Sequence, residues 1–217
     1  DPELNPIRLE HESVDDVTHS VVETEDGKLE ERTNTIFSPQ EFVVNIGPQH
    51  PATHGVLRLR TSLDGETVKK IDVYCGYVHR GIEKLCESLT YPQTLHFADR
   101  LDYLSAQQNR HAVCLCIEDA LQVEVPARAQ YIRTIMDELM RISSHLLFWS
   151  TFCMDLGGTT AFFYGFRDRE KILDIFEETC GARMTFNYYT IGGLMADLHP
   201  DFQRKVKEFC AYMPAKL

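Results

Sequence analysis

Two histidines of the sequence lie four residues apart in His50-Pro-Ala-Thr-His54. Helical zinc sites use this spacing, but Pro48, Pro51 and Gly55 predict a loop, and no acidic residue follows His50 as the zinc-protease motif requires. One alternative is that the histidines bond to the backbone of a tight loop. The other is that an imidazole in this rigid, polar loop donates a proton near neutral pH.

Two further segments place carboxylates where a partner is needed. In Asp99-Arg-Leu-Asp-Tyr103, both aspartates lie near a predicted helix start and can act as caps, and Tyr103 can be a core residue of an amphipathic helix. In Cys153-Met-Asp155-Leu-Gly-Gly, a carboxylate ends a long apolar helix, where burial and the helix dipole both oppose its charge. A partner such as a histidine is therefore expected for Asp155.

The cysteines favour a reduced, metal-free protein. There are seven, at positions 75, 86, 114, 116, 153, 180 and 210, and most lie in apolar periodic segments. An odd number of scattered cysteines predicts buried thiols rather than disulfides. Cys114 and Cys116 form the one close pair, and a spacing of two on a helix directs them to different faces. We predict no metal ligands in the chain.

Hydrophobic periodicity predicts the elements that must position these segments. A β-rich run at 42–46, an alternating run at 55–63 and an apolar run beyond Asp64-Gly65 indicate a three-stranded antiparallel sheet. From about His79 onward the apolar period is helical. The predicted helix from Pro126 to Asp155 would be about 45 Å long. Helices are predicted over 80–89, 99–121, 126–155, 167–179 and 201–212.

Composition and charge indicate the class of protein and the division of the chain into domains. The 217 residues are 43% hydrophobic and 25% charged, as in globular proteins, and the net charge of −11 argues against nucleic-acid partners. Residues 1–40 hold 11 acidic and 3 basic residues, which predicts an acidic linker or arm. No apolar run reaches the ~18 residues of a membrane span. We expect an α+β fold: a small antiparallel sheet in 41–76, then a partial helical bundle in 77–217, truncated at its C-terminus.

A set of motifs occurs in a specific order along the chain. They are Asn-Ile-Gly-Pro-Gln-His-Pro-Ala-Thr-His-Gly-Val-Leu-Arg at 45–58, Gly-Tyr-Val-His-Arg-Gly-Ile-Glu-Lys at 76–84, Asp-Arg-Leu-Asp-Tyr at 99–103, Asp-Leu-Gly-Gly at 155–158 with Phe-Phe-Tyr at 162–164, Gly-Ala-Arg-Met at 181–184 and Ile-Gly-Gly at 191–193. In order and spacing they resemble the D, or 49-kDa-type, subunit of respiratory complex I, the proton-translocating NADH:quinone oxidoreductase. The resemblance covers about residues 42–217, the N-terminal half of that subunit. The acidic arm resembles the connection of fused C/D subunits.

The resemblance implies a fold and a mechanism. The family is related to nickel-iron hydrogenase large subunits, which implies a hydrogenase-like helical bundle. His54 and Tyr103 match residues at the inner end of a quinone tunnel, and Asp155 matches the carboxylate that pairs with this histidine. A reduced quinone is basic at both oxygens, so two donors would stabilise and protonate it. The resemblance places the terminal [4Fe-4S] cluster on the neighbouring B subunit, with Arg80 beside it.

The resemblance also implies partners and a location. The partners would be the B and C subunits and the membrane-arm subunits of the quinone site, and the chain would lie peripherally on the cytoplasmic side of the bacterial inner membrane. Two positions depart from the family: Thr185 replaces a common histidine near the cluster and Thr190 replaces an arginine, which should make the cluster harder to reduce.

Two alternatives belong to other functional classes. A nickel-binding hydrogenase relative would need Cys-x-x-Cys pairs, and the sequence contains none. A non-catalytic scaffold would use the helices only to hold other subunits. The joint presence of His54, Tyr103 and Asp155 favours the quinone site, although the isolated chain is expected to be inactive because cluster and flavin belong to other chains.

Overall fold

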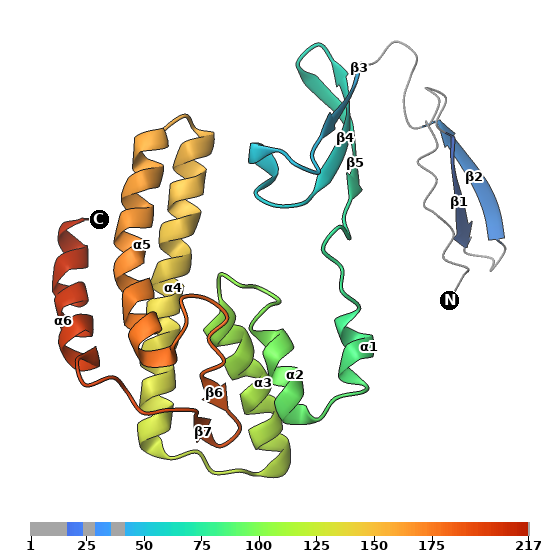
Figure 1. Ribbon diagram of the computed structural model, residues 1–217. Helices are drawn as coiled ribbons and strands as arrows, with labels where there is room; N and C mark the ends of the chain where they lie inside the picture. Colours follow the sequence, from blue (N-terminus) through green and yellow to red (C-terminus); the bar gives the residue numbers. More distant parts are fainter. Residues whose placement is uncertain (1–16, 24–28, 36–41, 217) are drawn as a thin grey trace, which may run out of the picture. The chain divides into compact units, whose positions relative to one another are not determined.

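The computed structural model describes residues 17–23, 29–35 and 42–216 (Figure 1). The chain separates into two units, residues 1–80 and 81–217. The first unit holds strands β1 to β5, and the second holds the α-helices and a short hairpin. The α+β fold class is confirmed, whereas the hydrogenase-like bundle and the domain boundaries at residues 40 and 76 stay predictions.

Two strands pair within the acidic N-terminal segment. β1 (Val17–Glu23) and β2 (Leu29–Thr35) are antiparallel, with Val17 opposite Thr35. The charge-based prediction of a linker or arm did not include them. β1 contains three valines and a threonine, and Asp26-Gly27 follows it, which together are a hairpin signal. The rest of the predicted arm lies outside the described residues.

The predicted three-stranded antiparallel sheet is confirmed. Its order is β3-β4-β5, formed by β3 (Phe42–Ile46), β4 (Arg58–Asp64) and β5 (Thr67–Tyr74). Gly65, at φ +61°, forms the turn between β4 and β5, where the sequence predicted a hairpin. Because β3 and β4 are neighbours with Ile46 opposite Leu59, the segment that carries His50 and His54 is a loop between adjacent strands.

The second unit is built on a long helix, α4 (Ala127–Asp155), close to the predicted bounds. It packs along α5 (Thr159–Cys180), which begins eight residues before the predicted start. The approach is close at Gly165, where an added Cβ would lie 1.8 Å from the Ser150 hydroxyl oxygen. The remaining elements are α1 (Ile82–Cys86), α2 (Tyr91–Ala98), α3 (Ala106–Leu121), β6 (Tyr189–Thr190), β7 (Gly193–Leu194), α6 (Phe202–Tyr212) and the 3₁₀ turn Met213–Ala215.

The predicted helix over 99–121 is wrong at its start. Residues 99–105 form turns, and α3 begins only at Ala106. The preceding helix α2 was missed, although Thr90 and Gln93 form a capping box at its N-terminus. The helical period of the apolar residues continues across the turn, so periodicity alone joined the turn to α3.

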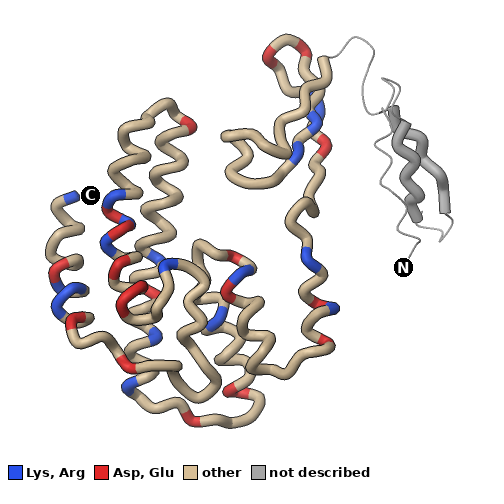
Figure 2. The backbone as a smooth tube through the Cα atoms, viewed as in Figure 1, with Lys and Arg blue, Asp and Glu red and all other residues tan. Residues whose placement is uncertain are grey.

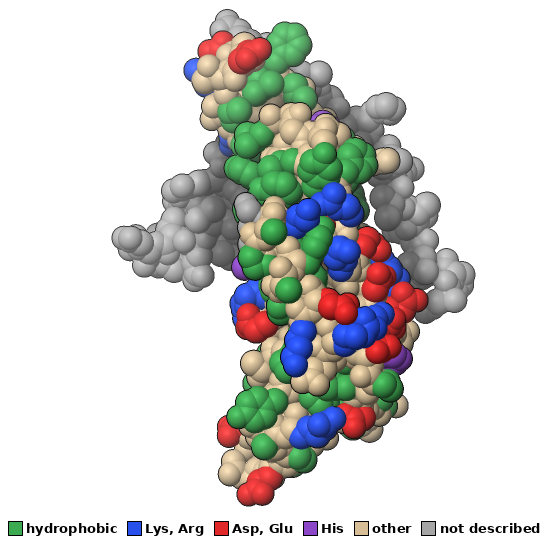
Figure 3. Space-filling model, turned by 90° about the vertical axis from the view of Figure 1, so that its left-hand side faces the viewer, with side chains coloured by type: hydrophobic (Ala, Val, Ile, Leu, Met, Phe, Trp, Pro, Cys, Tyr) green, Lys and Arg blue, Asp and Glu red, His purple; other side chains and the backbone are tan. Residues whose placement is uncertain are grey.

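The hydrophobic core lies in the helical unit. Half of its buried side chains come from α4 and α5, among them Met136, Leu139, Ile172 and Phe176. Between residues 142 and 154, α4 carries no Lys, Arg, Asp or Glu (Figure 2). Hydrophobic side chains gather over the ends of α4 and α5 near residues 148–164, and charged side chains cover α5 and α6 (Figure 3). None of the described helices combines the length and hydropathy needed to cross a bilayer.

The seven cysteines are free, but the prediction that most are buried is wrong. Only Cys114 is buried, whereas Cys75, Cys116 and Cys210 are exposed. A helical stripe of apolar residues covers a broad arc, and Cys116 is not among the buried residues of α3. Burial raises the pKa of the Cys114 thiol to about 11, which suppresses its thiolate.

We expect three thiols of the native chain to react rapidly with a disulfide reagent at neutral pH. These are Cys75, Cys116 and Cys210, because a reagent can reach them without unfolding. Cys114 should react only at the rate of unfolding. Stopped-flow measurement of thiol release checks this, and a variant with all three exposed cysteines replaced by serine should lose the rapid phase. A rapid phase that survives in that variant would contradict the exposure pattern.

Candidate functional site

In the loop between β3 and β4, the side chain of the first histidine, His50, forms a hydrogen bond with the loop backbone. His50 Nδ1 accepts a hydrogen bond from the Ala52 N–H at 3.1 Å, at the start of the 3₁₀ turn Pro51–Thr53. The Thr53 hydroxyl donates to the His50 carbonyl at 2.8 Å. Gly47, at φ +91°, closes the loop, because an added Cβ would lie 1.8 Å from the Leu57 carbonyl oxygen. The predicted loop is confirmed, and His50 stabilises it.

His54 lies at the end of this turn in the left-handed region, at φ 49°. Its backbone N–H donates to the Pro51 carbonyl at 3.4 Å, and its side chain is exposed. Arg80, the last residue of the first unit, is exposed as well. Their predicted roles at the quinone and beside the cluster stay predictions.

Tyr103 lies in the turn between α2 and α3. The Ser105 N–H donates to the Asp102 carbonyl at 3.0 Å and closes the turn, and Asp102 Oδ1 accepts from the Leu104 N–H at 3.1 Å. Asp102 thus caps a turn, whereas Ser105 occupies the N-cap position of α3. Tyr103 is 54% exposed, and within the described ranges its hydroxyl makes no hydrogen bond.

The sequence suggested that Asp99 caps a helix start, but in the structure it does not. It follows the last residue of α2, is 1% exposed, and its Oδ2 accepts from Arg110 Nη1 at 3.1 Å and from the Asn187 N–H at 2.9 Å. Asp99 therefore belongs to a buried ion pair that joins α2, α3 and the segment before β6.

Asp155 ends α4 as predicted. Leu156 and then Gly157, at φ +90°, follow it and terminate the helix. The Asp155 side chain is exposed. Tyr103 and Asp155 belong to the second unit and His54 to the first, and the pairing of His54 with Asp155 stays a prediction.

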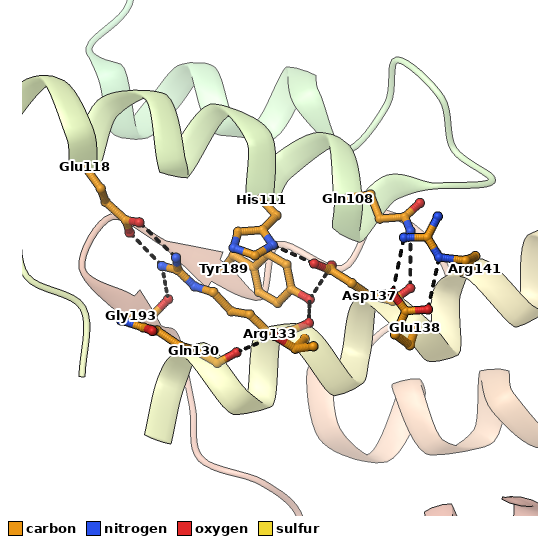
Figure 4. Close-up of polar contacts among 11 residues, drawn as sticks. Gln108, His111, Glu118, Gln130, Arg133, Asp137, Glu138, Arg141, Tyr189 and Gly193 are labelled. Atoms are coloured by element: carbon orange, nitrogen blue, oxygen red, sulfur yellow. Dashed lines mark hydrogen bonds and ion pairs between the residues drawn. The ribbon is translucent and has the colours of Figure 1, made fainter. Parts of the chain in front are cut away.

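A buried polar network between α3, α4 and the β6–β7 hairpin escaped the sequence analysis (Figure 4). Arg133 is 1% exposed and donates to both oxygens of Glu118, at 2.9 and 2.7 Å. Arg133 Nη2 also donates to the carbonyls of Thr190 and Gly193, at 2.8 and 3.0 Å. Glu118 Oε1 accepts from the Gly192 N–H at 2.8 Å. The ion pair thereby holds the turn between β6 and β7 against both helices.

The same network continues along α4 to Asp137. The Tyr189 hydroxyl donates to Asp137 Oδ1 at 2.8 Å, and His111 Nδ1 lies 2.5 Å from Asp137 Oδ2. Burial and the Asp137 carboxylate both raise the pKa of Tyr189, which therefore stays protonated. A charged residue beside Ile132 and Met136, inside the apolar stripe of α4, was the sequence signal that could have identified Arg133.

A cavity in the helical unit lies apart from the three predicted site residues. It measures about 930 Å³, opens between α4, α5 and the 3₁₀ turn Met213–Ala215, and is lined by Trp149 and Tyr164 among others. None of His54, Tyr103 and Asp155 lines it. Among the described residues, no three His, Cys, Asp or Glu side chains are placed to hold a metal ion. The absence of metal ligands in the whole chain stays a prediction.

Comparison with known proteins finds subunits of one enzyme complex. Residues 155–217 match the family model described as the 49 Kd subunit of respiratory-chain NADH dehydrogenase. The chain is 65% identical over 213 residues, 98% of its length, to the C/D subunit of NADH-quinone oxidoreductase from Phocaeicola vulgatus, and 64% identical over 214 residues to that of Bacteroides thetaiotaomicron. It is 46% identical over 178 residues, 82% of its length, to the D subunit from Bacillus cytotoxicus. These matches make the chain similar to part of the D subunit of NADH-quinone oxidoreductases.

The D-subunit family relatives are longer than this chain. The chain spans 41% of the C/D relative from P. vulgatus and 49% of the D relative from B. cytotoxicus. The C/D match leaves out only four of the 217 residues, so it includes nearly all of the acidic segment, whereas the D match covers 178 residues. The resemblance to the D-subunit family, predicted from the motifs, is confirmed.

Proposed function

We propose that this chain is part of a peripheral-arm subunit of a proton-translocating NADH:quinone oxidoreductase and forms part of its quinone-reduction site. The observation that carries the proposal is the 65% identity to a C/D subunit of NADH-quinone oxidoreductase across 98% of the chain. The terminal [4Fe-4S] cluster would belong to the B subunit, beside Arg80. Other partners would be the C subunit and the membrane-arm subunits of the quinone site, at the cytoplasmic side of the inner membrane.

Tyr103 and His54 are the proposed donors to the quinone head group. Two-electron reduction places negative charge on both quinone oxygens, and two oriented donors stabilise that charge and supply protons. The structure supports Tyr103 as a donor because the side chain is 54% exposed, lies on a hydrogen-bonded turn, and uses its hydroxyl for no other contact in the described part of the chain. His54 is exposed on a loop that His50 and Thr53 stabilise through the backbone.

Asp155 is proposed to pair with His54 in the assembled enzyme. A carboxylate at a helix C-terminus is disfavoured by the helix dipole, and a protonated imidazole offsets this cost. The pair would favour the protonated form of His54, which then serves as the acid that protonates the reduced quinone.

We expect His54→Ala to lower quinone reduction by the assembled enzyme about 100-fold, the usual size of a lost general acid, and to flatten its pH dependence. Asp155→Asn should change the pH profile in the same direction. The matched control is His145→Ala, which should leave both unchanged, because His145 is also exposed but lies on α4, outside this loop. Steady-state quinone reductase activity in membranes measures both effects. A wild-type pH profile and rate in His54→Ala would favour the non-catalytic scaffold instead.

A further inference from the structure

Two neighbouring residues of α3 hold the two ends of the turn that presents Tyr103. At the first end, Arg110 Nη1 donates to Asp99 Oδ2 and to the Leu95 carbonyl, both at 3.1 Å. Arg110 Nε also donates to the Tyr189 carbonyl at 2.5 Å. The Arg110 and Asp99 side chains are 3% and 1% exposed, so this end of the turn is fixed to the interior of the helical unit.

At the other end, Asn109 Nδ2 donates to the Asp102 carbonyl at 2.9 Å. The same oxygen accepts the Ser105 N–H that closes the turn, at 3.0 Å. A carbonyl oxygen has two lone pairs, so both acceptor positions are used. Asn109 therefore ties the turn to α3 at the residue directly before Tyr103.

These contacts restrain the backbone around Tyr103 and leave its side chain accessible. We propose that Asn109 and Arg110 are positioning residues for Tyr103, which hold its phenol in the orientation needed to donate to the quinone. This inference rests on the proposed function of Tyr103. A misplacement of about 1 Å at a reacting group can cost ~100-fold in rate, so a tether on the preceding residue has a direct effect on the donor.

The Asn109 tether provides the sharper test, because it is partly exposed and its loss removes no core packing. Asn109→Ala should lower kcat/KM for the quinone about tenfold in the assembled enzyme, a part of the cost of a misplaced group. Electron transfer from NADH to an artificial acceptor should not change. The matched control is Gln108→Ala, because the Gln108 amide donates to the Asp137 carbonyl on α4 and does not touch the turn.

A double-mutant cycle separates positioning from a general structural effect. If Asn109 acts through the phenol, Asn109→Ala causes no further loss in a Tyr103→Phe background. Arg110→Lys, which keeps a cation but loses the guanidinium fork, should show the same non-additivity in enzyme that assembles. The inference would be overturned if the losses of quinone reductase activity multiplied in the double variants. It would also be overturned if Asn109→Ala had wild-type kinetics while Tyr103→Phe was impaired.

Amide hydrogen exchange of the purified chain gives a readout that does not depend on activity. The Leu104 and Ser105 amides should exchange about tenfold faster in Asn109→Ala than in the wild type, because the hydrogen bond that ties the turn to α3 is lost. If these amides exchange in Asn109→Ala at the wild-type rate, Asn109 does not restrain the turn and the inference is overturned. Full quinone reductase activity of Tyr103→Phe would instead overturn the proposed role of Tyr103, so the two failures are distinguishable.

Discussion

Replacement of Tyr103 by phenylalanine is expected to lower quinone reduction about 100-fold or more, because an oriented donor to a developing oxyanion is typically worth that much. Tyr103→Phe removes the hydroxyl and keeps the ring. In the described structure that hydroxyl makes no hydrogen bond, so its removal leaves no buried group without a partner. Assembly and stability should therefore be unchanged.

Two activities measured on the same membranes isolate the effect. Quinone reduction by NADH should fall, whereas NADH oxidation with an artificial acceptor upstream of the cluster should stay at the wild-type rate. Tyr131→Phe is the matched control, because Tyr131 is also exposed but lies on α4 outside the proposed site. Normal quinone reduction in assembled Tyr103→Phe enzyme would show that the tyrosine has no chemical role.

Of the substitutions proposed for this chain, replacement of Arg133 by methionine is expected to lower the free energy of unfolding most. The variant leaves the buried Glu118 carboxylate without its cation and removes the Arg133 hydrogen bonds to the carbonyls of Thr190 and Gly193. Removal of one partner of a buried ion pair typically lowers the free energy of unfolding by about 3–5 kcal/mol. Urea denaturation of the purified chain, followed by circular dichroism, measures the loss.

The chain offers a matched control on the same helix. Arg141 pairs with Glu138 at 3.0 Å, but both side chains are more than half exposed (Figure 4). Arg141→Met should therefore leave the free energy of unfolding nearly unchanged, because solvent screens an exposed pair. A loss in Arg133→Met as small as in Arg141→Met would show that the buried network does not stabilise the fold.

The difference in the free energy of unfolding between the wild type and Arg133→Met should also depend on pH. Burial alone would raise the pKa of Glu118, but the hydrogen bonds from Arg133 and from the Gly192 N–H outweigh it and hold the pKa below its ordinary value of 4.5. A carboxyl whose pKa is lower in the native state than in the unfolded state stabilises the fold fully when the pH is above the unfolded-state pKa. This contribution disappears as the pH falls through the lowered native pKa. The gap between wild type and Arg133→Met should therefore narrow in acid, below about pH 4.5.

Local patterns were sufficient for most of the secondary structure. Alternation of apolar residues and the Asp64-Gly65 turn predicted the β3-β4-β5 sheet, and apolar spacings of three and four predicted α4 almost to the residue. The motifs also predicted the resemblance to the D-subunit family. These signals are local because strand and helix geometry repeat over two to four residues, so the sequence carries them directly.

The tertiary structure alone decided the roles of the buried charges. Glu118 and Arg133 lie 15 residues apart on different helices, and Asp99 meets the Asn187 N–H across 88 residues. Such contacts have no period that a sequence shows, and they changed Asp99 from a predicted helix cap to half of a buried ion pair. The exposure of Cys116 and the turn at 99–105 likewise depend on how α2, α3 and α4 pack. Pairing and burial are properties of the packed helices, because each requires a partner that only the folded chain brings within reach.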